Sequence, residues 1–329
     1  MKKFIIFVAV LAVLIVTLAM FVFLGEDEPD TVSNEKTDIK VAVLNGTTGF
    51  GMAHLMEQNA NNKADNNYTF TVEKEGSDII AQLINGTVDI AALPTNAAAT
   101  VYNRTQGGVK IIAINTLGVL YIVENGTAIE SINDLEGKTI YCPAQNPQFI
   151  LEYLLNKNNI NATIDTTYSA PADLRAALVA NQLGENAVAV LPEPMVTMAT
   201  SANSQLRVAL NLTNEWDNVE DNQLVQGCIV VRNKFLTKNK DAVNKFLSEY
   251  KASIEYVKNN VDDAAKLIVK HGIFANENVA KAAIPKCNLT YIDGDNMKTV
   301  MEGFIAAMKE VAPQSIGGKT PADDFYYVK

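Results

Sequence analysis

The sequence has few of the residues that most often build metal centres and catalytic triads. Among its 329 residues are two histidines and three cysteines, which is little material for a zinc site or a Ser-His-Asp triad. The cysteines Cys142, Cys228 and Cys287 are odd in number and widely spaced, so they predict no disulfide framework. We interpret them as small buried residues, with a Cys142–Cys228 pair left open. We expect neither a metal nor a cofactor.

Arginine is also scarce, and the formal net charge is -10. Nucleic-acid binding needs clustered lysine and arginine, so this balance argues against nucleic acid as a partner. The four arginines are Arg104, Arg175, Arg207 and Arg232. A bound anion would therefore find few guanidinium groups.

The first residues differ from the rest of the chain. Lys2 and Lys3 precede an apolar run from Phe4 to Leu24. This run is long enough to cross a bilayer, and it ends without a small-x-small cleavage pattern. We interpret 1–25 as a membrane anchor with a cleaved signal as the alternative, and the acidic segment 26–37 as a linker. The lysines favour an inside N-terminus, so we expect the main part on the extracytoplasmic face of the membrane, or secreted if the segment is cleaved.

Strand-like and helical segments alternate along the remaining chain, which predicts an α/β fold with mostly parallel sheets. Two extended stretches, Val109–Val123 and Leu224–Val231, each contain a glycine and resemble crossings between domains. We predict two lobes, one of residues 38–118 with 229–329 and the other of residues 119–228. Two such lobes joined by two hinge crossings form a clamshell, and ligands of α/β sheets bind at the carboxyl ends of the strands.

Four short segments, in this order, carry a resemblance to a known family. They are LINGTVDIA at 83–91, SINDLEGKTI at 131–140, ALVAN at 177–181 and VAVLPEP at 188–194. Through these four segments the chain resembles the substrate-binding proteins of bacterial ABC importers, in the NMT1/THI5-like (SsuA-like) group. The resemblance covers about residues 38–310 and departs from the family in two places. No lipid-modified cysteine follows the apolar run, and Glu185-Asn186 stands where an aspartate is usual.

The resemblance implies a type II, periplasmic-binding-protein-like clamshell without catalytic activity. It implies that the protein captures a small organic molecule, pyrimidine-like, vitamin-precursor-like or sulfonate-like, and delivers it to an ABC permease with its ATPase. A ligand-sensing lobe for a signalling partner is one alternative. An enzyme similar to the thiamine-pyrimidine synthases is another, although His54 is the only histidine within 38–118 and no cysteine cluster exists.

The predicted ligand-binding residues follow the predicted strands. The glycine-rich turn after the first strand lacks the lysine of a phosphate-binding loop and the last glycine of a dinucleotide fingerprint, so it predicts a small-anion or carbonyl site at a helix start, or only a tight turn. Further candidates follow later strands, where they also fit as helix caps or surface residues. The predicted set is Thr47, Thr48, Gly49, Phe50, Gly51, Thr95, Asn96, Gln145, Asn146, Glu193 and Gln226.

These side chains suit a neutral or amine-bearing ligand better than nitrate or a simple sulfonate, because an obvious Arg or Lys is missing from the set. Arg175, near the start of its predicted helix, is the exception. Tyr121 and Tyr168, together with Phe50, are candidates for stacking on a flat ligand, although aromatic residues at such spacings also belong to cores.

Overall fold

The structure, a computed structural model, describes residues 36–328. The predicted anchor at 1–25 and nearly all of the predicted linker lie outside the described residues. Thr37–Lys329 forms one compact unit. Among its described residues, no helix has both the length and the apolar character that a bilayer crossing requires.

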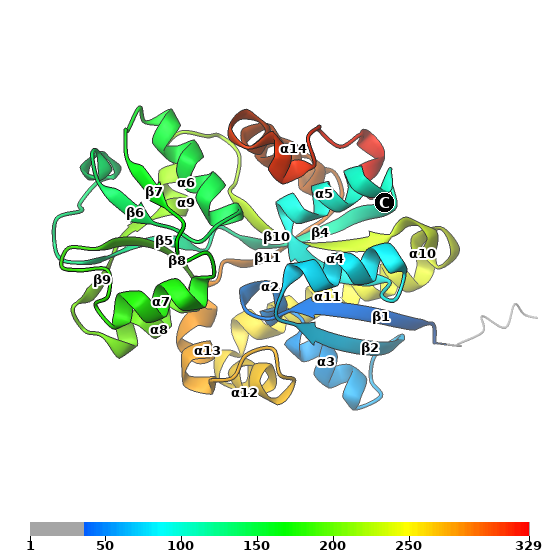
Figure 1. The fold of residues 1–329 in the computed structure, drawn as a ribbon. Coiled ribbons are helices and arrows are strands. Elements are labelled where there is room, and N and C mark those ends of the chain that lie inside the picture. Colours follow the sequence, from blue (N-terminus) through cyan, green and yellow to red (C-terminus); the bar gives the residue numbers. More distant parts are fainter. Residues whose placement is uncertain (1–35, 329) are drawn as a thin grey trace, which may run out of the picture. The chain divides into compact units, whose positions relative to one another are not determined.

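Two β-sheets organise this unit (Figure 1). The strands of the six-stranded sheet, in spatial order, are β11 (Leu289–Ile292), β4 (Val109–Leu117), β10 (Val225–Arg232), β3 (Ile90–Pro94), β1 (Asp38–Leu44) and β2 (Asn67–Glu73). Those of the five-stranded sheet are β7 (Thr163–Asp165), β6 (Thr139–Tyr141), β8 (Val188–Pro192), β5 (Leu120–Asn125) and β9 (Leu206–Asn211). The predicted two-lobed α/β fold is confirmed.

Helices cover both faces of each sheet. Those that pack with the six-stranded sheet include α2 (Thr47–Phe50), α3 (Ala53–Ala60), α4 (Gly76–Asn85), α5 (Thr95–Thr105), α10 (Asn233–Lys238), α11 (Lys240–Asn259), α12 (Val261–Lys270), α13 (Glu277–Ala283) and α14 (Gly294–Val311). Those that pack with the five-stranded sheet are α6 (Asn146–Lys157), α7 (Pro171–Val179), α8 (Met195–Ala202) and α9 (Leu212–Asp217). Short 3₁₀ turns are η1 (Ile132–Leu135), η2 (Ile284–Lys286), η3 (Pro313–Ile316) and η4 (Asp323–Phe325).

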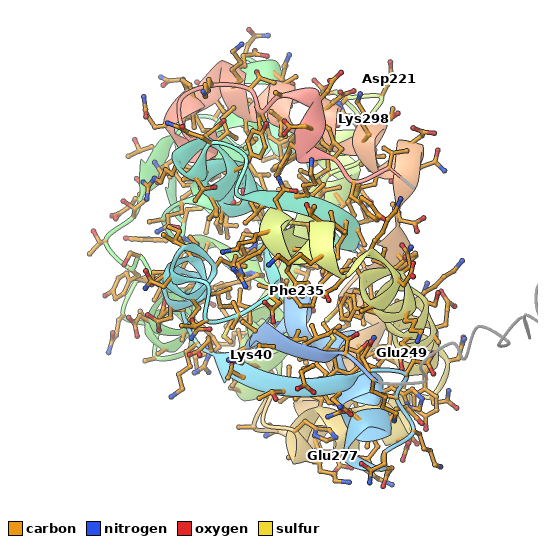
Figure 2. All side chains as sticks on the ribbon, turned by 90° about the vertical axis from the view of Figure 1, so that its right-hand side faces the viewer. Lys40, Asp221, Phe235, Glu249, Glu277 and Lys298 are labelled. Atoms are coloured by element: carbon orange, nitrogen blue, oxygen red, sulfur yellow. The ribbon has the colours of Figure 1, made fainter. Side chains whose placement is uncertain are left out.

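Successive side chains of a strand point to opposite faces of its sheet, so they show which helices cover each face. In β1, Ala42 packs with the cluster that contains α4, α5 and α14, whereas Val41 and Val43 pack with α3, α11 and α12. The apolar face predicted for the long helix near residue 250 is buried, as Phe246, Tyr250 and their neighbours show. Charged side chains such as Lys40 on β1 and Glu277 on α13 remain exposed (Figure 2). Burial of these alternating apolar sets is the main favourable contribution to folding.

The sheets are mixed rather than mostly parallel, which corrects the expectation from sequence. β10 runs antiparallel to β3 and β4, and β5 runs antiparallel to β8 and β9. The edge strand β11 also runs antiparallel to its neighbour β4. Of the reversed strands, β5 and β10 directly follow a passage from the other sheet. Such a strand enters at the edge where its neighbours end, so it runs opposite to them.

The two crossings differ from each other. The first is as predicted, since β4 of one sheet leads to β5 of the other through Gly118 and Val119 alone. The second was predicted at Leu224–Val231, but residues 225–231 are already β10 of the six-stranded sheet. The return passage is therefore the segment 218–224 that follows α9. The predicted lobe limits themselves stay a prediction.

An aromatic row joins the helices of the two sheets on one side. The ring of Trp216 in α9 lies 5.0 Å from that of Tyr153 in α6 and 6.2 Å from that of Phe304 in α14, measured between centroids. The buried residues of this region form one cluster with both sheets. The two halves therefore share a continuous hydrophobic core beside the crossings.

Candidate functional site

The strand ends of the two sheets meet at the short crossing. Leu117 and Leu120 are three residues apart, so their Cα atoms are at most about 11 Å from each other. Leu117 pairs with Val225 in one sheet, and Leu120 pairs with Pro192, the last residue of β8, in the other. The edge where β3 and β4 end therefore lies close to the edge where β8 and β9 end. This is the position at which α/β sheets bind ligands.

Close packing fixes the crossing itself. A Cβ atom on Gly118 would lie 2.2 Å from Oγ1 of Thr213 and 2.9 Å from a methyl group of Leu224, so only glycine fits. The N–H of Val119 donates to Oε1 of Gln226 at 3.0 Å. The carbonyl oxygen of Val119 accepts from the N–H of Glu193 at 3.0 Å. Gln226, predicted as a ligand contact, thus has its amide oxygen bound to the crossing.

Near these strand ends, several polar side-chain atoms have no hydrogen bond. Among the described residues they are Oδ1 of Asn96, Oδ1 of Asn146, Oε1 of Glu193, Oγ1 of Thr197 and Oγ1 of Thr213. The first four of these side chains are buried, with relative exposures of 7%, 9%, 2% and 3%. An unpaired polar group costs about 1–3 kcal/mol when it is buried. A ligand that supplied the missing partners would remove that cost.

Three of these five residues, Asn96, Asn146 and Glu193, were predicted from sequence. Thr197 and Thr213 were not. Thr197 lies four residues after Glu193, one helical turn along, and this spacing was the available signal. Thr213 follows β9, a strand that the sequence pattern did not reveal, because its burial alternates only weakly.

Glu193 is the buried carboxylate of the group. Its Oε2 accepts from the N–H of Thr197 at 3.2 Å. Burial raises the pKa of the Glu193 carboxyl above its ordinary value, and the neighbouring Thr197 and the charge of Lys286 offset part of this rise. A donor group of a ligand, above all a cationic amine, would favour the charged carboxylate.

The glycine-rich turn is explained largely by packing. A Cβ atom on Gly49 would lie 2.2 Å from the carbonyl oxygen of Leu44 and 2.9 Å from side-chain atoms of Val43 and Ile273. A Cβ atom on Gly51 would also be too close to its neighbours, at 2.8 Å from a side-chain carbon of Ile254.

The aromatic residue of the turn, Phe50, is fully buried, with its ring edge-on to Phe274 at 6.0 Å. The carbonyl oxygen of Thr48 accepts from Asn115 at 2.9 Å. Ligand contact by Thr47, Thr48, Gly49, Phe50 and Gly51 stays a prediction, but only the two threonines lack a packing role that accounts for the residue type.

The other predicted residues have varied surroundings. The hydroxyl of Thr95 donates to the carbonyl oxygen of Val225 at 3.2 Å and so joins the end of β3 to β10. Gln145 is exposed and has a positive φ of 67° just before α6. Nε of Arg175 is buried without a hydrogen bond, so this residue remains the exception expected from sequence.

The aromatic candidates outside the turn also have other contacts. The hydroxyl of Tyr121 donates to the carbonyl oxygen of Lys286 at 3.3 Å. Tyr168 packs against the apolar cluster of α7 and α8.

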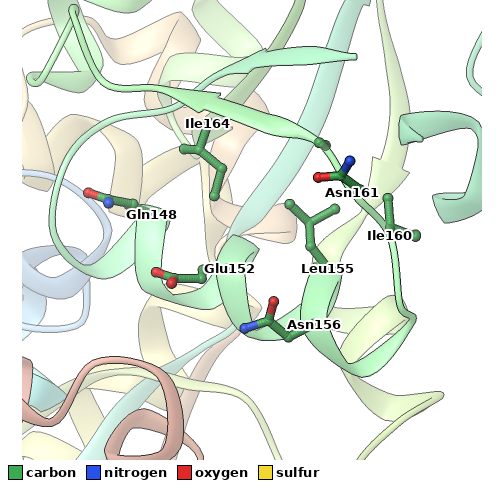
Figure 3. Close-up of a pocket in the computed structure, with 8 residues that line it drawn as sticks. Gln148, Glu152, Leu155, Asn156, Ile160, Asn161 and Ile164 are labelled. Atoms are coloured by element: carbon green, nitrogen blue, oxygen red, sulfur yellow. The ribbon is translucent and has the colours of Figure 1, made fainter. Parts of the chain in front are cut away.

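A separate surface hollow of about 320 Å³ lies on the flank of α6 beside β7 (Figure 3). Its lining residues are Gln148, Glu152, Leu155, Asn156, Ile160, Asn161, Ala162 and Ile164. None of the predicted site residues belongs to it. Its position on the outer strand of the five-stranded sheet separates it from the strand ends at the crossing.

The cysteines are buried free thiols, so the Cys142–Cys228 pair that the sequence left open does not form. Burial raises the pKa of Cys142 and of Cys228, which makes both unreactive at neutral pH. Within residues 36–328, no group of three or more His, Cys, Asp or Glu side chains is placed to hold a metal ion.

Solved structures share this fold. An ABC transporter protein from Parabacteroides distasonis superimposes with a TM-score of 0.75 at 23% identity, covering 89% of this chain and 100% of that one. The aliphatic sulphonate binding protein SsuA from Escherichia coli gives 0.71 at 13%, covering 89% and 92%. The alkanesulfonate-binding protein SsuA from Xanthomonas axonopodis pv. citri, bound to MOPS, gives 0.67 at 13%, covering 90% and 99%. At such identities these likenesses establish the fold.

Sequence comparison supplies the family. Comparison with curated proteins finds no match. The family model described as NMT1/THI5 like matches residues 67–264, more than half of the chain. That range includes the first crossing, β8 with Glu193, and the return to β10. The chain therefore belongs to the NMT1/THI5-like family.

Proposed function

We propose that this protein is the extracytoplasmic substrate-binding component of an ABC importer. In this proposal a small organic molecule binds between the two lobes, which close over it by hinge motion at the crossings. The observation that carries the proposal is the set of unpaired polar atoms at strand ends of both sheets, on either side of a two-residue crossing. The family and the printed descriptions of the structural neighbours support it.

The proposed partners follow from that role. They are the ligand, a permease with its ATPase, and the membrane through the N-terminal segment. The proposed lobes are 38–118 with 229–329, and 119–228. We propose no catalytic step, since the site consists of amides, hydroxyls and one carboxylate.

The chemistry of the site favours a ligand that donates hydrogen bonds. The unpaired atoms of Asn96, Asn146 and Glu193 are all acceptors, and the threonine hydroxyls can accept as well. A pyrimidine-like or vitamin-precursor-like molecule with an amino group would satisfy them. A sulfonate would need donors instead, and Arg175 is the side chain to supply them.

Native mass spectrometry of the full chain, made in a bacterial host, tests the proposal directly. We expect denaturation to release a small molecule whose mass names its class. A thermal-shift screen of aminopyrimidines, vitamins, alkanesulfonates and amino compounds covers the case of a protein purified empty. If none of these compounds raised the melting temperature and no mass were released, the binding role would be wrong.

Two substitutions on α6 locate the site. Asn146→Ala removes an unpaired amide at the start of the helix, whereas Asn156→Ala changes the outer hollow of Figure 3. We expect the first to weaken binding about 10- to 100-fold, because a hydrogen bond to a buried group is lost. The second should leave affinity unchanged. The opposite result would place the ligand in the outer hollow.

A further inference from the structure

The peptide group between Gly118 and Val119 is held at both of its polar atoms by side-chain amides. Its carbonyl oxygen, on Gly118, accepts from Nδ2 of Asn288 at 2.5 Å. Its N–H, on Val119, donates to Oε1 of Gln226 at 3.0 Å. Asn288 immediately precedes β11 and Gln226 lies in β10, so both amides come from the six-stranded sheet.

The orientation of this peptide plane is coupled to the angle between the sheets. The crossing has two residues, so few backbone rotations connect β4 to β5. The plane of the 118–119 peptide turns with ψ of Gly118 and φ of Val119. Two hydrogen bonds on opposite edges of that plane oppose both rotations.

Asn288 is well suited to this contact. Its backbone has a positive φ of 42°, a conformation that asparagine and glycine adopt more readily than other residues. Its own carbonyl oxygen accepts from the N–H of Leu117 at 3.1 Å. Asparagine combines tolerance of this backbone with a side-chain amide that donates to the carbonyl oxygen of Gly118, the residue after Leu117.

A second contact from the same segment reaches the other sheet. The hydroxyl of Tyr121, in β5, donates to the carbonyl oxygen of Lys286 at 3.3 Å. The segment from Lys286 to Asn288 therefore touches the chain on both sides of the crossing. It is a further noncovalent connection between the sheets, beside the shared hydrophobic core.

We propose that Asn288 and Gln226 are positioning residues. Their hydrogen bonds to both polar atoms of the Gly118–Val119 peptide set the angle between the two lobes in the absence of ligand. The inference rests on the proposed function, because it concerns the hinge that closes the proposed ligand site. Gln226 then acts on binding through the hinge, not by touching the ligand.

Distance measurements between spin labels on the full chain, without ligand, test whether these two hydrogen bonds set the angle between the lobes. Label sites are Ile84→Cys on α4, which packs with the six-stranded sheet, and Val208→Cys on β9 of the five-stranded sheet; the two residues are 50% and 43% exposed. The native thiols are buried and stay unlabelled. Asn288→Gly keeps the backbone conformation and removes the amide. Asn288→Asp keeps the left-handed preference and replaces the donating Nδ2 with a carboxylate oxygen, which is charged at neutral pH and repels the Gly118 carbonyl oxygen.

We expect both variants to change the ratio of the populations with short and long label distances about fivefold or more. This is the effect of losing one net hydrogen bond. Gln226→Leu should act in the same direction. The matched control is Asn181→Gly, which removes another positive-φ asparagine with one side-chain hydrogen bond, to Asn125 within the five-stranded sheet. It should leave the distances unchanged, and circular dichroism checks that all variants fold.

Unchanged distance distributions in both Asn288 variants would overturn the inference. So would an equal change in Asn181→Gly, because the effect would then be general loosening. These readouts need no ligand, so they stand apart from the binding tests. If ligand binding were normal and the label distances did not change on loss of the Asn288 amide, the positioning role of Asn288 would be wrong while the importer role would stand.

Discussion

Replacing Gly49 with alanine separates packing from ligand binding in the glycine-rich turn. The added Cβ would lie 2.2 Å from the backbone oxygen of Leu44, and 2.9 Å from side-chain atoms of Val43 and Ile273. The side chains have room to move only slightly, because Val43 is fully buried in the core, as is Ile273. The oxygen belongs to β1, which is paired on both sides and cannot shift alone.

The cost follows from overpacking. Forcing a methyl group into a filled core costs about 1–3 kcal/mol. At about 2–4 °C per kcal/mol for a domain of somewhat smaller size, the melting temperature should fall by about 2–12 °C. If the glycine served only to let a ligand approach, the unliganded protein would keep its stability and lose affinity alone.

The assay is thermal unfolding of the protein without ligand, monitored by circular dichroism. Gly76→Ala is the matched control, because a Cβ there meets no atom within 4 Å and the residue begins α4. We expect that variant to gain about 0.5 kcal/mol from reduced freedom of the unfolded chain. Equal melting temperatures for Gly49→Ala and the parent protein would refute the packing explanation.

Two further predictions concern pH. The folded-state pKa of Glu193 is raised by burial above its ordinary value of 4.5, so the ionised group opposes folding at neutral pH and this cost vanishes below about pH 4. Glu193→Gln should therefore raise the melting temperature at pH 7 but not at pH 4, and an equal gain at both would contradict this reasoning. The pKa of Glu57 is lowered to about 2, first by its hydrogen bond from Lys270, so its contribution is present above pH 4.5 and lost as pH falls through about 2. Glu57→Gln should destabilise the protein at pH 6 and lose most of this effect near pH 2, as thermal melts across that range would show; a constant difference would argue against the ion pair.

The positions that follow buried strands could be found from sequence because the pattern there is local. Short apolar runs such as those of β3 and β8 end at a proline, and the next residues begin a helix. Asn96 and Glu193 were identified by that rule, and both have a buried polar atom without a partner. The rule also selected Phe50, which packs in the core, since an apolar residue after a strand has the same local signature in either role.

The sequence by itself determined the α/β class, the two-lobed arrangement and the first crossing, because apolar periodicity and turn residues act between near neighbours. Only the tertiary structure decided which strands run antiparallel and what holds the crossing. Gln226 and Asn288 lie 107 and 170 residues from the atoms that they bind. Such contacts depend on how strands pair and sheets pack, so no local pattern records them.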